Sequence, residues 1–184
     1  MSALHRPTPE AAVPESPAHA TRQAGRRFEY VTEWRLDAPV ERVWDALVDV
    51  ERWPQWWPQV RAVQTLHRGA ASDLGTVRRI RWGSRLPYGF ELDVETTEVT
   101  PTARLRGRAS GDMAGEGLWE LERDGAGTFV RYTWQLELHT RWMRLAAPFM
   151  APVFRWNHEG VMRAGGKGLA RHLAAKPALR LVRH

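Results

Sequence analysis

One ionisable side chain, His158, lies on an otherwise apolar stripe near the end of the sequence. At about 100° per residue the stripe shares one helix face, formed by Met143, Ala147, Met150, Phe154, His158, Val161, Gly165 and Leu169. Histidine titrates near neutral pH without perturbation, so His158 is suited to contact a ligand or to act as a general acid or base. The alternative is a neutral core histidine with one hydrogen bond, which is the commoner outcome for a lone histidine.

Several kinds of chemistry are excluded by what the sequence lacks. There are no cysteines, which excludes disulfides, thiolate nucleophiles, iron–sulfur clusters and zinc fingers. We find no Gly-x-Ser-x-Gly elbow, His-Glu-x-x-His motif or dinucleotide fingerprint, and the glycines around Lys167 lack phosphate-loop spacing. The histidines at 67, 139, 158 and 172 show no metal-ligand spacing. We therefore expect no metal site and no cofactor.

The composition is ordinary except for tryptophan and arginine. The 184 residues include ten tryptophans, and the formal net charge is +6. Tryptophan has a large apolar ring with one N–H donor, so it lines cores, interfaces and binding sites. There is no run of about 20 apolar residues to span a membrane and no apolar N-terminal region typical of a secretory signal. We expect a cytoplasmic protein, which also suits the absence of cysteine.

The positioning elements begin with a strand at 28–36, whose residues alternate with period two. A short helix follows, in which Pro39 suits the first position and Asp37 or Ala38 lies near the cap. Its apolar stripe consists of Val40, Val43, Trp44 and Leu47. A second short helix or turn is predicted around 50–56. It carries an aromatic group bracketed by prolines, namely Trp53, Trp56 and Trp57 with Pro54 and Pro58.

Six further strands and a long helix complete the prediction. The strands are expected at about 59–67, 74–82, 89–99, 102–109, 114–123 and 127–139, with turn residues between them at hairpin spacing. The helix covers about 141–175, with a kink, or a break into two helices, at Pro148 and Pro152. Residues 1–26 are interpreted as a disordered tail, 27–176 as one domain, and 177–184 as a C-terminal tail.

The order of these elements and several short motifs resemble the START-like, or SRPBCC, superfamily, particularly its polyketide cyclase/dehydrase-like subgroup. The motifs are Leu36-Asp37-Ala38-Pro39, Val43-Trp44-Asp45-Ala46-Leu47, Trp53-Pro54-Gln55-Trp56-Trp57-Pro58, Gly127-Thr128 and Trp156-Asn157-His158. The resemblance implies an α+β helix-grip fold, in which a seven-stranded antiparallel sheet curls around the C-terminal helix and leaves a cavity between them.

The residues expected to line that cavity are the alternate strand residues that face inward and the residues of the apolar helix stripe. We predict a ligand-binding set of Tyr30, Thr32, Trp34, Phe90, Leu92, Val94, Trp119, Tyr132, Trp134, Met150, Phe154, His158 and Val161. The alternative is that they fill a solid core. Gly165 and Gly166 indicate either close helix–sheet approach or room for a ligand. We expect Arg78 to be exposed, although its parity also allows it to meet an acidic ligand at the cavity mouth.

Charge patterning argues against a nucleic-acid partner despite the basic composition. Successive predicted strands carry arginines and then acids on their outward positions, for example Arg79 and Arg81 beside Glu91 and Asp93. Cross-strand pairs of this kind neutralise a solvent face, whereas phosphate binding needs an uninterrupted basic one. Transient contact with a membrane surface is an alternative, which would use Trp53, Trp56 and Trp57 near Arg52 and Arg61. The favoured interpretation is that these indoles seal one end of the fold.

Three functional hypotheses follow. The first is binding of a hydrophobic or aromatic small molecule, of lipid, quinone or polyketide type, in the cavity. The second is a polyketide cyclase, aromatase or dehydratase with His158 as acid or base and with Tyr30 or Tyr132 orienting a carbonyl. The third is a protein-interaction module whose cavity is vestigial.

Overall fold

The computed structural model describes residues 27–83, 89–137 and 141–175. Its elements in chain order are β1 (Arg27–Leu36), α1 (Val40–Val48), η1 (Val50–Arg52), α2 (Trp53–Trp56), β2 (Val60–His67), β3 (Val77–Trp82), β4 (Phe90–Thr100), β5 (Arg104–Gly111), β6 (Ala114–Asp124), β7 (Gly127–Glu137) and α3 (Arg141–Ala175). These bounds agree closely with the predicted elements. The predicted tails at 1–26 and 177–184 lie outside the described residues.

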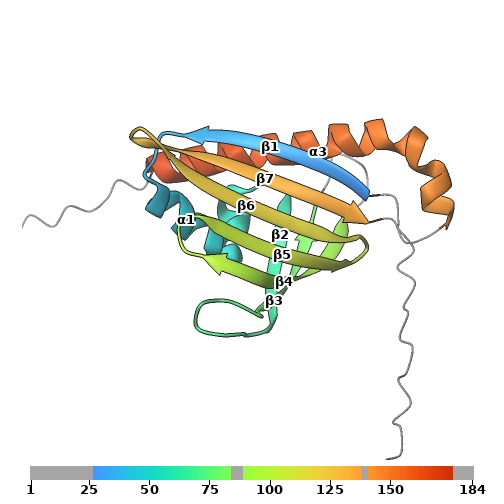
Figure 1. Cartoon of the computed structure of the whole chain (residues 1–184), viewed down its shortest axis with the longest axis horizontal. Coiled ribbons are helices and arrows are strands. Elements are labelled where there is room, and N and C mark those ends of the chain that lie inside the picture. The colour runs from blue at the N-terminus through green and yellow to red at the C-terminus, as the bar shows by residue number, and fades with distance from the viewer. Residues whose placement is uncertain (1–26, 84–88, 138–140, 176–184) are drawn as a thin grey trace, which may run out of the picture.

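The seven strands form one antiparallel sheet in the order β1-β7-β6-β5-β4-β3-β2. Consecutive strands pair as hairpins from β2 to β7, and β1 joins the far side of β7. The sheet curls, and α3 runs along its β1 side, while α1 and α2 cover one end (Figure 1). This is the predicted α+β helix-grip architecture.

The turn from β1 into α1 is fixed by the last strand. The Thr128 hydroxyl on β7 is buried and donates a 2.7 Å hydrogen bond to the Ala38 carbonyl. Pro39 is the N-cap rather than the first helical residue, one position from our prediction, and its carbonyl accepts from the backbone N–H of Arg42 and of Val43. The four residues of the predicted α1 stripe are all buried.

The tryptophans after α1 anchor the short helices to the rest of the fold. The indole N–H of Trp53 donates to the Leu47 carbonyl at 3.1 Å, and that of Trp57 donates to the Val161 carbonyl of α3 at 3.0 Å. Trp57 is 1% exposed. Because a buried indole needs an acceptor for its N–H, the Trp53 bond fixes α2 against α1 and the Trp57 bond fixes the end of α2 against α3.

Helix α3 is a single element of 35 residues that includes both Pro148 and Pro152. Figure 1 shows its first turns bending away from the axis of the remainder. The structure therefore agrees with the predicted kink rather than with a break into two helices. Interior prolines bend a helix because each removes a hydrogen bond and clashes with the preceding turn.

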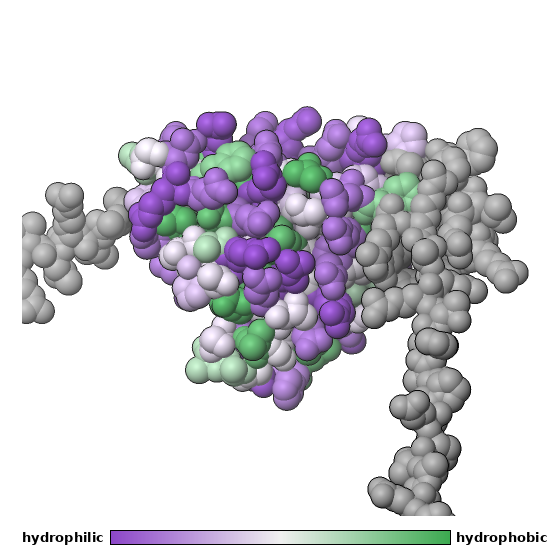
Figure 2. All heavy atoms as spheres, in the orientation of Figure 1, coloured by the Kyte–Doolittle hydropathy of each residue, from purple (hydrophilic) through white to green (hydrophobic). Residues whose placement is uncertain are grey.

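The outer face of the sheet is a lattice of ion pairs that cross neighbouring strands, as the sequence predicted. The pairs include Arg79–Asp93, Arg81–Glu91, Arg106–Glu98, Arg108–Glu116 and Arg131–Glu33. The view in Figure 2 is accordingly mostly hydrophilic, with hydrophobic residues in small separate groups. Exposed pairs of this kind are each worth at most about 1 kcal/mol.

Candidate functional site

Four polar or aromatic side chains from three elements meet between the β1–β7 side of the sheet and α3. Thr32 and Tyr132 are directly opposite each other in the β1–β7 pairing, and Tyr30 lies two residues earlier on the same face of β1. From α3, the His158 ring stacks on Tyr30 at 5.1 Å between centroids and lies 6.5 Å from Tyr132. Its Nε2 atom is 3.5 Å from the Thr32 hydroxyl oxygen. We call Tyr30, Thr32, Tyr132 and His158 the His158 cluster.

Burial keeps the His158 cluster uncharged at neutral pH. It lowers the pKa of His158 to about 4, because the surrounding protein replaces the water that would solvate an imidazolium. Burial also raises the pKa of the Tyr132 hydroxyl well above its ordinary value of 10.0. The pKa of Tyr30 is raised by burial too, with Arg155 acting in the opposite direction. The cluster therefore offers neutral hydrogen-bonding groups, and His158 can accept a proton only as a weak base.

A glycine makes room for the Tyr132 hydroxyl. The Tyr132 ring packs against Trp119 on β6, with 4.2 Å between centroids. A Cβ atom at Gly117 would lie 2.6 Å from the Tyr132 hydroxyl oxygen, so any side chain there would displace it. Sequence reasoning missed Gly117. A glycine inside a predicted strand is itself a signal of close approach by another group.

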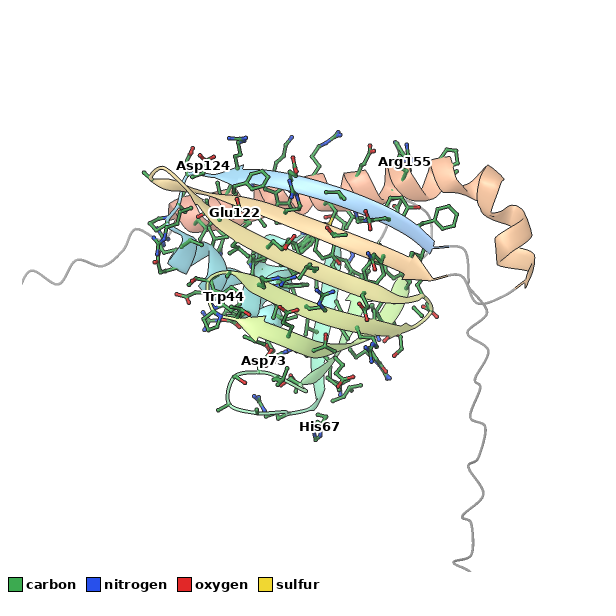
Figure 3. All side chains as sticks on the ribbon, in the orientation of Figure 1. Trp44, His67, Asp73, Glu122, Asp124 and Arg155 are labelled. Atoms are coloured by element: carbon green, nitrogen blue, oxygen red, sulfur yellow. The ribbon has the colours of Figure 1, made fainter. Side chains whose placement is uncertain are left out.

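Arg155 was also missed, because it does not belong to the apolar stripe of α3. It lies three residues before His158, is exposed, and acts electrostatically on Tyr30. Figure 3 labels it on α3. No described carboxylate lies within ion-pair distance of its guanidinium. Arg155 thus places a positive charge beside the otherwise neutral cluster.

No ring contact or hydrogen bond joins the other described site residues to the His158 cluster, except the packing of Trp119 on Tyr132. Trp34 and Trp119 are buried in a tryptophan cluster that also contains Trp53, Trp56, Trp57 and Trp82. Phe90, Leu92 and Val94 lie on β4, three strands from β7, and Phe90 stacks on Trp82 at 6.3 Å. Trp134 packs with Leu136 in a separate apolar group, and Val161 is buried. The side chains of Met150 and Phe154 lie outside those described.

The glycines of α3 serve close packing. A Cβ at Gly165 would lie 2.5 Å from Cε2 of Trp57, and one at Gly166 would lie 2.9 Å from Nε1 of Trp34. Close packing rather than room for a ligand therefore explains both glycines. The helix approaches the sheet closely at Gly166, against Trp34 of β1, whereas Gly165 packs against Trp57, between α2 and β2. The tryptophan end of the interior is therefore filled by side chains.

The expectation that Arg78 is exposed is wrong. Arg78 is 6% exposed and donates two hydrogen bonds of 2.7 Å to Asp73 and one of 3.0 Å to Glu51. The reason is the turn at Asp73, whose φ of 75° directs its carboxylate back towards β3. Burial opposes ionisation of Asp73, but the guanidinium outweighs it and holds the pKa of Asp73 below its ordinary value. With two carboxylates beside it, Arg78 is not free to meet an acidic ligand.

The three indoles considered for membrane contact are buried. Trp53, Trp56 and Trp57 are at most 6% exposed, so they seal one end of the fold as favoured and form no interfacial patch. None of the helices in the described ranges has the length and apolar character needed to cross a bilayer. Among the same residues no group of three histidine, aspartate or glutamate side chains is arranged to hold a metal ion.

Comparison with known protein families identifies one match. The model of a family described as polyketide cyclase/dehydrase and lipid transport matches residues 27–174, which is most of the chain. No curated protein sequence is similar enough to count as a match.

Solved structures with the same fold share low sequence identity with this chain. The protein TTHA0849 from Thermus thermophilus is 24% identical with a TM-score of 0.65, over 81% of this chain and 99% of its own. A START superfamily protein from Mycobacterium smegmatis is 14% identical with a TM-score of 0.67, over 80% and 97%. The Zhui aromatase/cyclase from Streptomyces sp. R1128 is 14% identical with a TM-score of 0.66, over 84% and 99%. These likenesses establish the START-like fold.

Proposed function

The chain belongs to the polyketide cyclase/dehydrase and lipid transport family, and on that basis we propose that it binds a hydrophobic small molecule of lipid, quinone or polyketide type. The binding site is a recess between the β1–β7 side of the sheet and α3, lined by the His158 cluster. His158, Tyr132 and Thr32 contact the polar group of the ligand, and neighbouring apolar side chains cover its carbon skeleton.

The observation that carries the proposal is the environment of Tyr132 and His158. Protein atoms surround both side chains, and this burial shifts the pKa of each strongly. Both nevertheless retain accessible surface and are only half-buried. A side chain that is surrounded by protein but still has accessible surface is expected to line a recess, because a filled core would leave it none.

The division of the apolar interior supports the same site. The main apolar cluster includes the tryptophan cluster and reaches Tyr132, whereas Leu136 packs in a separate group with Phe28, Met113 and Trp134. A domain of this size normally has one continuous core. Tyr30 belongs to neither described group, as expected if a ligand completes the packing between them.

The hydrogen-bonding capacity of the cluster indicates the kind of polar group it would bind. In the part of the chain that the structure describes, the Tyr132 hydroxyl makes no hydrogen bond. It is free to donate one to a ligand oxygen, and an uncharged acceptor enters a half-buried site at a lower desolvation cost than a charged one. A carbonyl on an aromatic or aliphatic skeleton fits this requirement.

The first test is what the purified full chain carries. Native mass spectrometry followed by organic extraction should detect a bound lipid, quinone or polyketide at about one per chain. A protein that is empty and also fails to take up the neutral apolar dye Nile red would overturn the proposal. That result would favour the alternative of an interaction module with a vestigial cavity.

A pair of matched probes tests the role of Tyr132. The protein should bind 2-acetylnaphthalene more tightly than 2-ethylnaphthalene, because only the former accepts a hydrogen bond. One such bond corresponds to about a threefold to tenfold difference in Kd. Tyr132→Phe should abolish this preference without weakening 2-ethylnaphthalene binding. The matched control, Tyr30→Phe, should keep the preference. Equal loss of both probes in Tyr132→Phe would argue against a hydrogen-bonding role.

A second candidate function, cyclase or dehydratase activity, is favoured by the convergence of Tyr132 and His158. In such a reaction the neutral His158 would remove a proton from carbon next to a carbonyl, and the Tyr132 hydroxyl would hydrogen-bond the resulting enolate oxygen. The carbanion would then attack a second carbonyl, forming the ring bond, and that oxygen would take up a proton. With an extracted ligand in hand, His158→Ala separates the functions: retained binding with lost conversion supports catalysis, and unchanged conversion excludes His158 as the base.

A further inference from the structure

The charges of this chain are segregated between α3 and the rest of the fold. Helix α3 contains five arginines, one lysine and a single acid, Glu159. Residues 27–83 and 89–137 together contain 14 arginines but 18 aspartates and glutamates. The sheet and its short helices are thus net acidic, while α3 is strongly basic. Among the described parts of the chain, α3 is therefore the one that contributes net positive charge.

The cations on the outer side of α3 lack the partners that arginines on the sheet have. Arg155, Arg163, Lys167 and Arg171 are all exposed. No described carboxylate lies within 4.0 Å of any of them, in contrast with the ion-paired arginines of the sheet surface. They recur at spacings of eight and four residues, so they lie along one side of the helix. Exposed Glu159 occupies the position between Arg155 and Arg163 in the same row, so Arg163, Lys167 and Arg171 form its uninterrupted basic part. At about 1.5 Å per residue, the row is about 24 Å long.

An exposed indole lies in the same row. Trp156 follows Arg155 directly and is 48% exposed, the largest exposed aromatic side chain that the structure describes. Its helical angle lies between those of Arg163 and Lys167, because it precedes them by about two and three turns. Tryptophan favours the boundary between water and lipid, where its ring meets apolar material and its N–H stays hydrated. We call Arg155, Trp156, Arg163, Lys167 and Arg171 the outer α3 face.

We propose that the outer α3 face docks the protein on an anionic phospholipid surface. A long row of unpaired cations without a groove fits a flat surface whose phosphates can rearrange under it. The exposed indole adds an interfacial anchor that a purely electrostatic contact with nucleic acid would not use. Docking brings the His158 cluster close to the lipid, since Arg155, labelled on α3 in Figure 3, lies one turn from His158 and acts electrostatically on Tyr30. The proposal does not depend on which ligand, if any, the interior binds.

Vesicle flotation of the full chain tests this surface. The protein should float with vesicles of phosphatidylcholine mixed with phosphatidylglycerol, and not with phosphatidylcholine alone, and added salt should release it. The test variant is Arg155→Glu/Arg163→Glu/Lys167→Glu. The matched control is Arg52→Glu/Arg61→Glu/Arg68→Glu, which makes the same change in net charge at three exposed positions on or next to η1 and β2. Thermal unfolding verifies that both variants fold.

The two variants should separate clearly. Removing three cations near an anionic surface corresponds to a loss of about a hundredfold in the partition coefficient. Replacing them with glutamates, which reverses their charge, should lower the partition coefficient further. The control should retain most of the wild-type binding, and Trp156→Ala should weaken it on its own. Equal losses in both triple variants would overturn the proposal, because binding would then follow net charge or the chain termini. So would binding to duplex DNA without binding to vesicles, which would assign the row to nucleic acid.

Discussion

Replacing His158 by glutamine should make folding stability less sensitive to acid. Burial lowers the pKa of His158 in the folded state to about 4, below the ordinary histidine value of 6.5 that applies to the unfolded chain. Between these two values the unfolded state binds more protons than the folded state, so the stability of the wild-type protein falls as the pH falls. His158→Gln removes this proton uptake while it keeps a polar side chain of similar length.

The size of the effect follows from the two pKa values. Their difference corresponds to about 3 kcal/mol, which is fully lost only below pH 4. About 2 kcal/mol of it should be lost between pH 7 and pH 5. The side chain is half-buried and keeps some contact with water, so these figures are ceilings. At pH 7 His158 is neutral in the folded state and mostly neutral in the unfolded chain, so its contribution to the pH dependence is small there.

Urea unfolding followed by circular dichroism at pH 7, 6 and 5 measures the effect. The difference in unfolding free energy between wild type and His158→Gln should change by up to about 2 kcal/mol across this range in favour of the variant. His67→Gln is the control, because it makes the same substitution at an exposed position, on β2. Parallel profiles for wild type and His158→Gln would refute the conclusion that burial holds His158 neutral.

Two further predictions concern packing and buried charge. Gly165→Ala should destabilise the fold by about 1–3 kcal/mol, measured by denaturant unfolding, because its Cβ would lie 2.5 Å from the Trp57 ring; unchanged stability would mean that α3 can shift away. Asp73→Asn should cost about 3 kcal/mol or more, since it weakens the main carboxylate partner of the buried Arg78. Asp93→Asn, in an ion pair on the sheet surface, should cost under about 1 kcal/mol, and equal effects of the two substitutions would contradict the role given to burial.

The secondary structure was predictable because each element carries a local signal. Alternation with period two marked strands such as β1 and β7, whose inward residues Tyr30 and Tyr132 lie on the expected face. Turn residues at hairpin spacing separated the strands. The outward-facing residues of each strand then determined the charge pattern of the sheet surface. The motif resemblance then supplied the sheet order and the place of α3, which local patterns do not specify.

The grouping of the site residues was not predictable from these signals. Thirteen residues were expected to line one cavity. Alternation along a strand, however, shows only which face of the sheet a residue lies on, and not where its strand lies among the seven. Tyr30, Thr32, Tyr132 and His158 meet because β1 pairs with β7 beside α3, whereas residues on β4 face a different part of the interior.

By itself, the sequence determined the elements, their faces and the excess of arginine, because these depend on residue type and on spacing along the chain. Tertiary structure decided which of those residues have partners. Arg78 is buried because the turn at Asp73 returns a carboxylate to it, and the sheet arginines are neutralised by strands adjacent in space. The cations on the outer side of α3 are left unpaired, because no described carboxylate, including that of Glu159 on the same side of the helix, comes within ion-pair distance of them.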